Sequence, residues 1–126
     1  MKLGAAAAVL FVLASGAGCG GSSGNPHFEE VSHQFYKAYC KRLHTCMKQI
    51  QGDAQGEISF TKAYPGGETD CVDENYKEFS SLNELESSCS QERWDACAKD
   101  LETSSCTQST TTPAIGVKIP DSCRGC

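Results

Sequence analysis

The stretch "FEEVSHQFYKAYCKRLHTCMKQI", residues 28–50, decides the fold that this sequence predicts. Its apolar side chains recur every three or four residues, which is the spacing of one face of an α-helix. They are Phe28, Val31, Phe35, Tyr39, Leu43, Met47 and Ile50. Asn25 and Pro26 precede them as a cap and a first helical residue, and Gly52 follows them as a stop. We therefore predict a helix of about six turns from this region to near Gly52.

Two further helices are predicted downstream. One covers about residues 69–80, and the other covers residues 91–102 with Ser90 as its cap. The glycines and prolines of residues 51–68 predict a long loop with a strand-like piece at 58–64. Residues 107–122 have no helical period and predict an extended segment. The expected fold class is all-α: a small disulfide-stapled array of about three helices with long loops and an extended C-terminal tail.

The predicted core is thin. Leu, Ile, Val and Phe number only 15 among residues 19–126. A domain with so few apolar side chains needs another source of stability, and small exported domains commonly use disulfides. The formal net charge of −5 disfavours binding to nucleic acid or to anionic lipid through charge alone.

The first residues have the layout of an export signal. Lys2 supplies a positive start, residues 5–14 a short apolar run, and residues 15–18 small side chains. The run is shorter than the ~20 residues that a membrane-spanning helix needs. We expect three parts: a signal peptide at 1–18, a Gly/Ser-rich flexible tether at 19–26, and a cysteine-rich helical domain at 27–126.

The nine cysteines divide into eight and one. Cys19 stands apart, at the end of the signal. The other eight lie in the domain and can form four disulfides. They are Cys40, Cys46, Cys71, Cys89, Cys97, Cys106, Cys123 and Cys126.

Helix geometry excludes some of the 105 possible pairings. Cys40 and Cys46 are about 9 Å apart along one helix, beyond the ~7 Å limit for bridged Cα atoms. Cys89 fails in the same way with Cys97 and with Cys106. A scheme compatible with these exclusions joins Cys40 and Cys46 to Cys97 and Cys71, and Cys89 and Cys106 to Cys123 and Cys126 in some order.

Two kinds of cysteine chemistry compete with structural disulfides. Cys40 and His44 are four residues apart on one helix face, a spacing that suits two zinc ligands. The "CRGC" of residues 123–126 has the spacing of a dithiol redox pair, but no predicted strand or helix follows it. We favour structural disulfides over both, and we predict no enzyme activity, no metal and no cofactor.

Small residues before a cysteine at the end of a signal resemble the lipobox of bacterial lipoproteins. "GAGC" (16–19), "YCKRLHTC" (39–46), "CSQERWDACAKDL" (89–101) and "CRGC" together resemble the cysteine-rich lipoproteins of myxobacteria and their relatives. This resemblance implies cleavage before Cys19, acylation of its sulfur and display from a bacterial envelope membrane, with Gly20 indicating the outer one. The alternative is ordinary signal cleavage, with Cys19 unacylated.

The function expected from these features is that of a non-enzymatic envelope lipoprotein acting as a binding or structural module. Its contact with the membrane is through lipid on Cys19, and its other partner is left open as a protein or a small ligand. The alternative from another class is a freely secreted, disulfide-rich carrier of a small apolar ligand held between helices.

Overall fold

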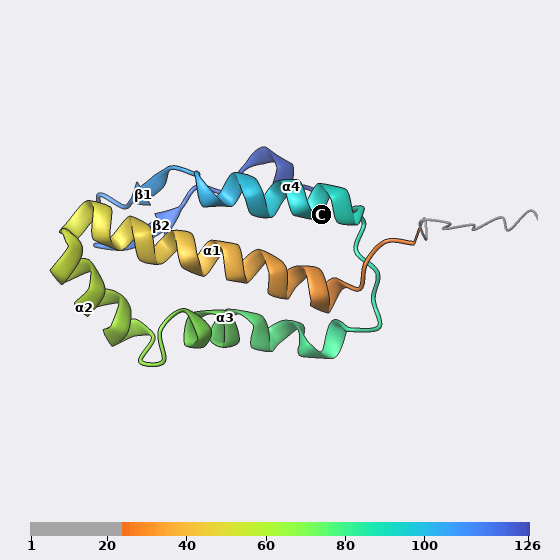
Figure 1. The fold of residues 1–126 in the computed structure, drawn as a ribbon, viewed down its shortest axis with the longest axis horizontal. Helices are drawn as coiled ribbons and strands as arrows, with labels where there is room; N and C mark the ends of the chain where they lie inside the picture. Colours follow the sequence, from red (N-terminus) through yellow and green to blue (C-terminus); the bar gives the residue numbers. More distant parts are fainter. Residues whose placement is uncertain (1–23) are drawn as a thin grey trace, which may run out of the picture.

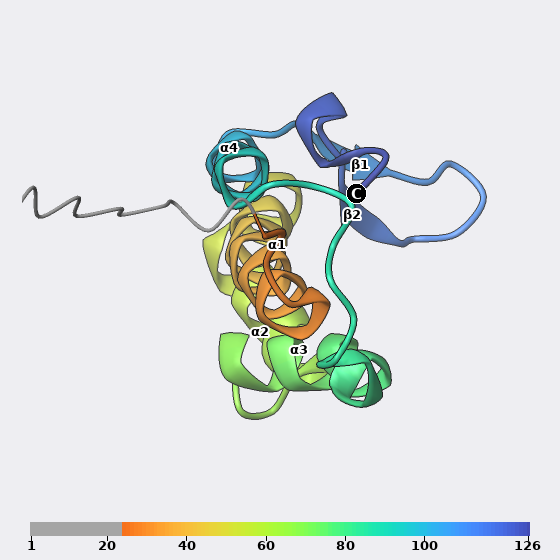
Figure 2. The same ribbon diagram turned by 90° about the vertical axis from the view of Figure 1, so that its right-hand side faces the viewer.

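The long helix α1, Phe28–Gln51, is the central element of the protein. The computed structural model describes residues 24–126, and α1 runs through the middle of them with α4 on one side and α2 and α3 on the other (Figures 1 and 2). The apolar stripe predicted from the sequence faces these neighbours. Val31 and Leu43 are buried in the core, with Phe35 and Tyr39 packed against it.

The start of α1 differs from the prediction by two residues. His27, and not Asn25, is the residue before the first turn. The main-chain N–H of Ser87 donates to the Pro26 carbonyl over 2.9 Å, and the N–H of Phe28 donates to the Leu85 carbonyl over 2.6 Å. Residues 26–28 therefore pair with the segment before α4, and this pairing keeps Pro26 out of the helix.

The prediction of a loop at residues 51–68 is wrong, because most of the segment forms helix α2, Asp53–Ala63. Gly52 adopts a φ of 90° and turns the chain from α1 into α2. Gly56 lies against α1 so closely that a Cβ atom there would be 2.5 Å from the Cα of Lys48. Phe60 is fully buried, whereas Ile58 is 60% exposed, as expected of opposite sides of a helix and not of a strand.

The two other helices follow their predictions closely. Helix α3, Glu68–Tyr76, continues into the 3₁₀ segment η1, Lys77–Leu82. Helix α4 spans Gln91–Glu102, and the Ser90 side chain accepts a hydrogen bond from the Arg93 N–H at its start. Ser90 therefore satisfies one of the free N–H groups in the first turn of α4.

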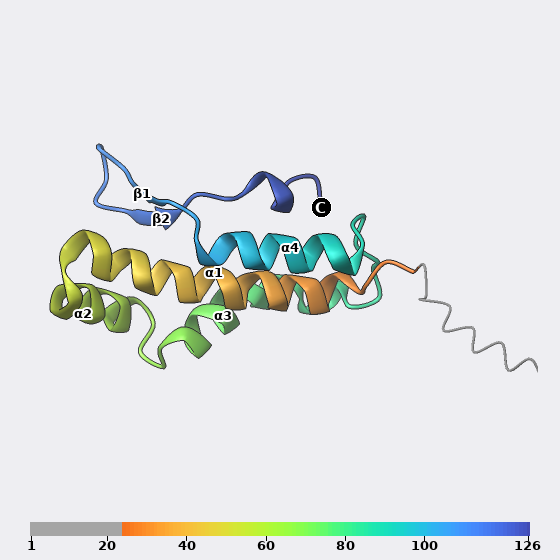
Figure 3. The same ribbon diagram turned by 45° about the horizontal axis from the view of Figure 1, so that its top comes forward.

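Residues 107–122 contain more structure than the predicted tail. Strand β1, Cys106–Gln108, pairs in antiparallel fashion with β2, Ile115–Val117, with Cys106 opposite Val117. A short 3₁₀ turn, η2 at Asp121–Cys123, follows. β2 packs on α1 and η2 packs on α4, so this segment covers the helices (Figure 3).

Four disulfides join the elements. The pairs are Cys40–Cys71, Cys46–Cys106, Cys89–Cys126 and Cys97–Cys123. The predicted scheme is correct only for the pairing of Cys89 with Cys126. Cys40 is bonded to Cys71 and not to Cys97. Cys46 is bonded to Cys106, which holds the hairpin against α1, and Cys97 is bonded to Cys123, which holds η2 against α4. The three pairings that helix geometry excluded do not occur among these four bonds.

The described residues thus form a small, mostly helical array linked by disulfides. Besides Phe60 of α2, six aliphatic or cysteine side chains of α1, α3 and α4 are fully buried. They are Val31, Cys40, Cys46, Cys71, Cys97 and Leu101. Cystine sulfur therefore replaces much of the aliphatic volume that the sequence lacks. Within residues 24–126, no helix is both long and apolar enough to cross a membrane.

Candidate functional site

The predicted site residues fall into two groups. Cys19, the predicted lipid attachment site, lies outside the described residues. The eight predicted disulfide cysteines all lie within them, and each is joined to another of the eight. The eight cysteines of the domain are therefore disulfide-bonded and carry no free thiol.

The structure contradicts both alternatives to structural disulfides, the zinc pair and the redox pair. The Cys40 sulfur is bonded to Cys71, so it cannot pair with His44 as a thiolate ligand. Cys123 and Cys126 are bonded to Cys97 and Cys89 and not to each other. No group of three metal-ligating side chains with suitable geometry occurs among residues 24–126.

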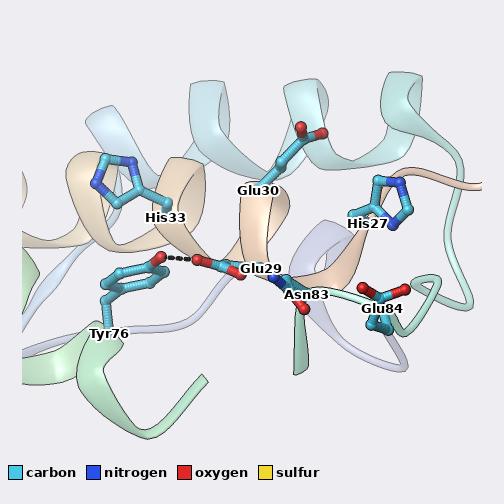
Figure 4. A pocket seen from close by; sticks show the side chains of 7 residues that line it. All are labelled: His27, Glu29, Glu30, His33, Tyr76, Asn83 and Glu84. Atoms are coloured by element: carbon cyan, nitrogen blue, oxygen red, sulfur yellow. Dashed lines mark hydrogen bonds between the residues drawn. The ribbon is translucent and has the colours of Figure 1, made fainter. Parts of the chain in front are cut away.

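An open cleft of about 790 Å³ lies beside the start of α1. It is lined by His27, Glu29, Glu30, His33, Tyr76, Asn83 and Glu84 (Figure 4). Three of these seven side chains are carboxylates. None is a serine, threonine, cysteine or lysine that could serve as a nucleophile.

One hydrogen bond crosses this cleft, from α3 to α1. The Tyr76 hydroxyl donates to Glu29, and this bond raises the pKa of Tyr76 above its usual value (Figure 4). The His33 ring lies edge-on to Tyr76 with 5.0 Å between ring centroids. The cleft therefore contains one hydrogen-bonded pair, Tyr76 and Glu29, and three carboxylates whose charge attracts a cationic group.

A second polar cluster joins α1, α2 and α3. His44 Nε2 lies 2.8 Å from Glu57 Oε2, and His44 Nδ1 lies 3.0 Å from Glu68 Oε1. The direction of each hydrogen bond depends on the tautomer of the ring. The imidazole also stacks on the Phe60 ring at 4.2 Å. His44 therefore links three helices, α1, α2 and α3.

Lys48 completes this cluster. Its ammonium lies 2.7 Å from Glu57 Oε2. The hydrogen bond from Lys48, followed by the one from His44, holds the pKa of Glu57 below its usual range. The same hydrogen bond raises the pKa of Lys48.

Hydrogen bonds fix α4 both at the surface and in the interior. At the surface, Asp95 accepts hydrogen bonds from Gln34 and Gln91, which lower its pKa. In the interior, the Trp94 indole N–H donates to the Ser87 hydroxyl over 2.7 Å. Ser87 is 2% exposed, so the segment before α4 is fixed by a buried hydrogen bond as well as by Cys89.

The fold and these clusters define a class of molecule: a small helical domain that disulfides and surface ion pairs hold together. Comparison with known proteins finds no matching protein family, no similar curated protein and no similar solved structure.

Proposed function

We propose that this protein is an exported, lipid-anchored envelope protein whose helical domain serves as a non-catalytic binding or structural module. In this proposal Cys19 carries the lipid, and residues 20–26 link it to the domain. The environment is oxidising, as four disulfides require for their persistence.

The observation that carries the proposal is the division of the cysteines. Eight cysteines of the domain pair among themselves, which supports a separate role for the ninth, Cys19. An odd cysteine in an exported protein calls for a partner outside the disulfide set. Two acyl chains on it would give stable attachment, because each buried methylene contributes about 0.8 kcal/mol.

The geometry of the domain is compatible with such an anchor. The chain reaches α1 through exposed residues at Gly24 and Asn25, at one end of the helical array (Figure 1). An extended chain spans at most about 3.3–3.6 Å per residue, so the eight residues 19–26 reach at most roughly 30 Å. The domain would then remain close to the membrane, with the start of α1 and the acidic cleft on the near side.

The absence of a catalytic role is supported by the described polar groups. The cleft lining includes no serine, threonine, cysteine or lysine, and the His44 cluster is occupied by contacts between helices. The Tyr76–Glu29 hydrogen bond and the His44 contacts each join one helix to another. A binding or structural role is the function that this geometry supports best.

The test is the mass of the N-terminal peptide and of the unreduced protein, isolated from cells that express it with its full N-terminal sequence. We expect an acylated Cys19 and a domain lacking the hydrogens of four thiol pairs. The Cys19→Ala variant should move from the membrane to the soluble fraction with its disulfides intact, whereas the matched control Ser22→Ala should stay at the membrane. An unmodified Cys19 in membrane-free protein would replace this proposal with the secreted carrier.

A further inference from the structure

The loop between β1 and β2 is unusually rich in hydroxyl groups. It reads "STTTPA" over residues 109–114, and eight of the eleven residues from 103 to 113 are serine or threonine. Figure 2 shows this loop extending away from the helices into solvent. Every residue from Thr107 to Ala114 is exposed.

The hydroxyl groups of the loop differ in their hydrogen bonding. Ser109 Oγ lies 3.1 Å from Thr111 Oγ1 and accepts from the main-chain N–H groups of Thr111 and Thr112. These bonds make a local turn that holds the loop in shape. Within residues 24–126, the Thr110 and Thr112 hydroxyls have no hydrogen-bond partner, so both are available to a reagent from solvent.

The fold does not explain why threonines occupy this loop. Tight hairpins favour Asn-Gly or Asp-Gly turns, and none occurs here. The hairpin is instead fixed at its base by the Cys46–Cys106 disulfide and by the pairing of Cys106 with Val117. Pro113 restricts Thr112 to extended backbone and keeps this side of the loop from coiling into a helix.

We propose that this loop is a site of O-glycosylation, with the Thr110 and Thr112 hydroxyls as acceptors. Clusters of serine and threonine next to proline are typical of O-glycosylated segments. The donor would be a sugar activated as a diphosphate ester, delivered by a glycosyltransferase of the same cell. The threonine Oγ1 bonds to the anomeric carbon, the bond from that carbon to the diphosphate oxygen breaks, and the hydroxyl proton passes to a base of the transferase.

The inference rests on the export part of the proposed function, and not on the lipid at Cys19. A glycan on the loop with an unmodified Cys19 would refute the anchor and leave this site in place. A lipid on Cys19 with an unglycosylated loop would support the anchor and refute the glycosylation site. One mass measurement on the same preparation therefore separates the two proposals.

The experiment uses the protein purified from the cells that encode it. After reduction and cleavage at lysine, the peptide 100–118 contains the whole loop. We expect a mass excess equal to whole sugar residues, released by alkaline β-elimination. The Thr110→Val, Thr112→Val double variant should lose the excess, and the control Ser80→Ala, Ser81→Ala, which removes two exposed hydroxyls of η1, should keep it.

Three results would overturn the inference. They are an unmodified peptide, a mass excess of phosphate, and a sugar that persists in the double valine variant. Valine keeps the β-branched shape of threonine, and far-UV circular dichroism would verify that both variants retain the helical fold.

Discussion

Deleting the Cys46–Cys106 disulfide should destabilise the domain more than deleting Cys97–Cys123. The first bond spans 60 residues of sequence and the second 26. Each pair has one fully buried cysteine and one that is partly buried, so alanine replacement costs similar packing energy in both cases. The comparison therefore isolates the effect of each bond on the unfolded chain.

The magnitude follows from the remaining cross-links. With the other disulfides intact, Cys97 and Cys123 remain connected in the unfolded chain by a short covalent path. This path runs over eight residues from Cys97 to Cys89, crosses the Cys89–Cys126 bond, and returns over three residues to Cys123. Loop-closure entropy for about a dozen residues gives roughly 3 kcal/mol. The shortest such path from Cys46 to Cys106 passes through Cys40–Cys71 and is about 40 residues long, which gives roughly 4 kcal/mol.

The assay is urea unfolding without reductant, followed by far-UV circular dichroism and by Trp94 fluorescence. The Cys46→Ala, Cys106→Ala variant should lose about 1 kcal/mol more than the Cys97→Ala, Cys123→Ala variant. Its m-value should also be larger, because its unfolded chain expands further. Equal losses, or a larger loss for the Cys97 pair, would refute the account of these bonds as restraints on the unfolded chain.

Three further predictions concern single side chains. Gly56→Ala should lower the free energy of unfolding by about 1–3 kcal/mol, because the new methyl group meets the α1 backbone at Lys48. Urea unfolding measures this loss, and the control Gln55→Ala, at an exposed neighbouring position, should change the free energy little. Glu57 has a lowered pKa in the folded state, chiefly through its hydrogen bond from Lys48, so its stabilising effect is complete above its unfolded value of 4.5 and disappears as pH falls through the folded value. Glu57→Gln should therefore show a shallower fall of melting temperature on acidification than the unmodified protein, and an unchanged slope would contradict this role. Ser87→Ala should lower the free energy of unfolding by about 1–3 kcal/mol, because it leaves the buried Trp94 N–H without an acceptor. Thermal or urea unfolding measures the change, and an unchanged stability would show that water replaces the hydroxyl.

The sequence predicts the elements whose apolar period is long or whose cap is clear. The stripe from Phe28 to Ile50 specifies α1 because seven apolar residues share one face. Ser90 marks the start of α4 because its hydroxyl accepts the N–H of Arg93. In both cases the information is local, so sequence reasoning is sufficient.

The rest depends on contacts between distant segments. The sequence predicts a loop where α2 lies, because glycine normally weakens a helix, but Gly56 permits the close approach of α2 to α1. The partner of Cys46 depends on the path of the chain after α4, and no periodic pattern in the sequence predicts that path. The His44 cluster depends on how three helices pack, and only the combination of His44 with carboxylates from α2 and α3 reveals it.

The order of the disulfides has a consequence for survival among proteases. Cys40–Cys71 overlaps Cys46–Cys106 along the sequence, and Cys46–Cys106 overlaps Cys89–Cys126. Every peptide bond between Cys40 and Cys126 is therefore bypassed by at least one covalent bridge. A single cut anywhere in this range adds one water molecule to the mass and releases no fragment, so a nicked domain stays one molecule until a reductant opens its sulfur bonds.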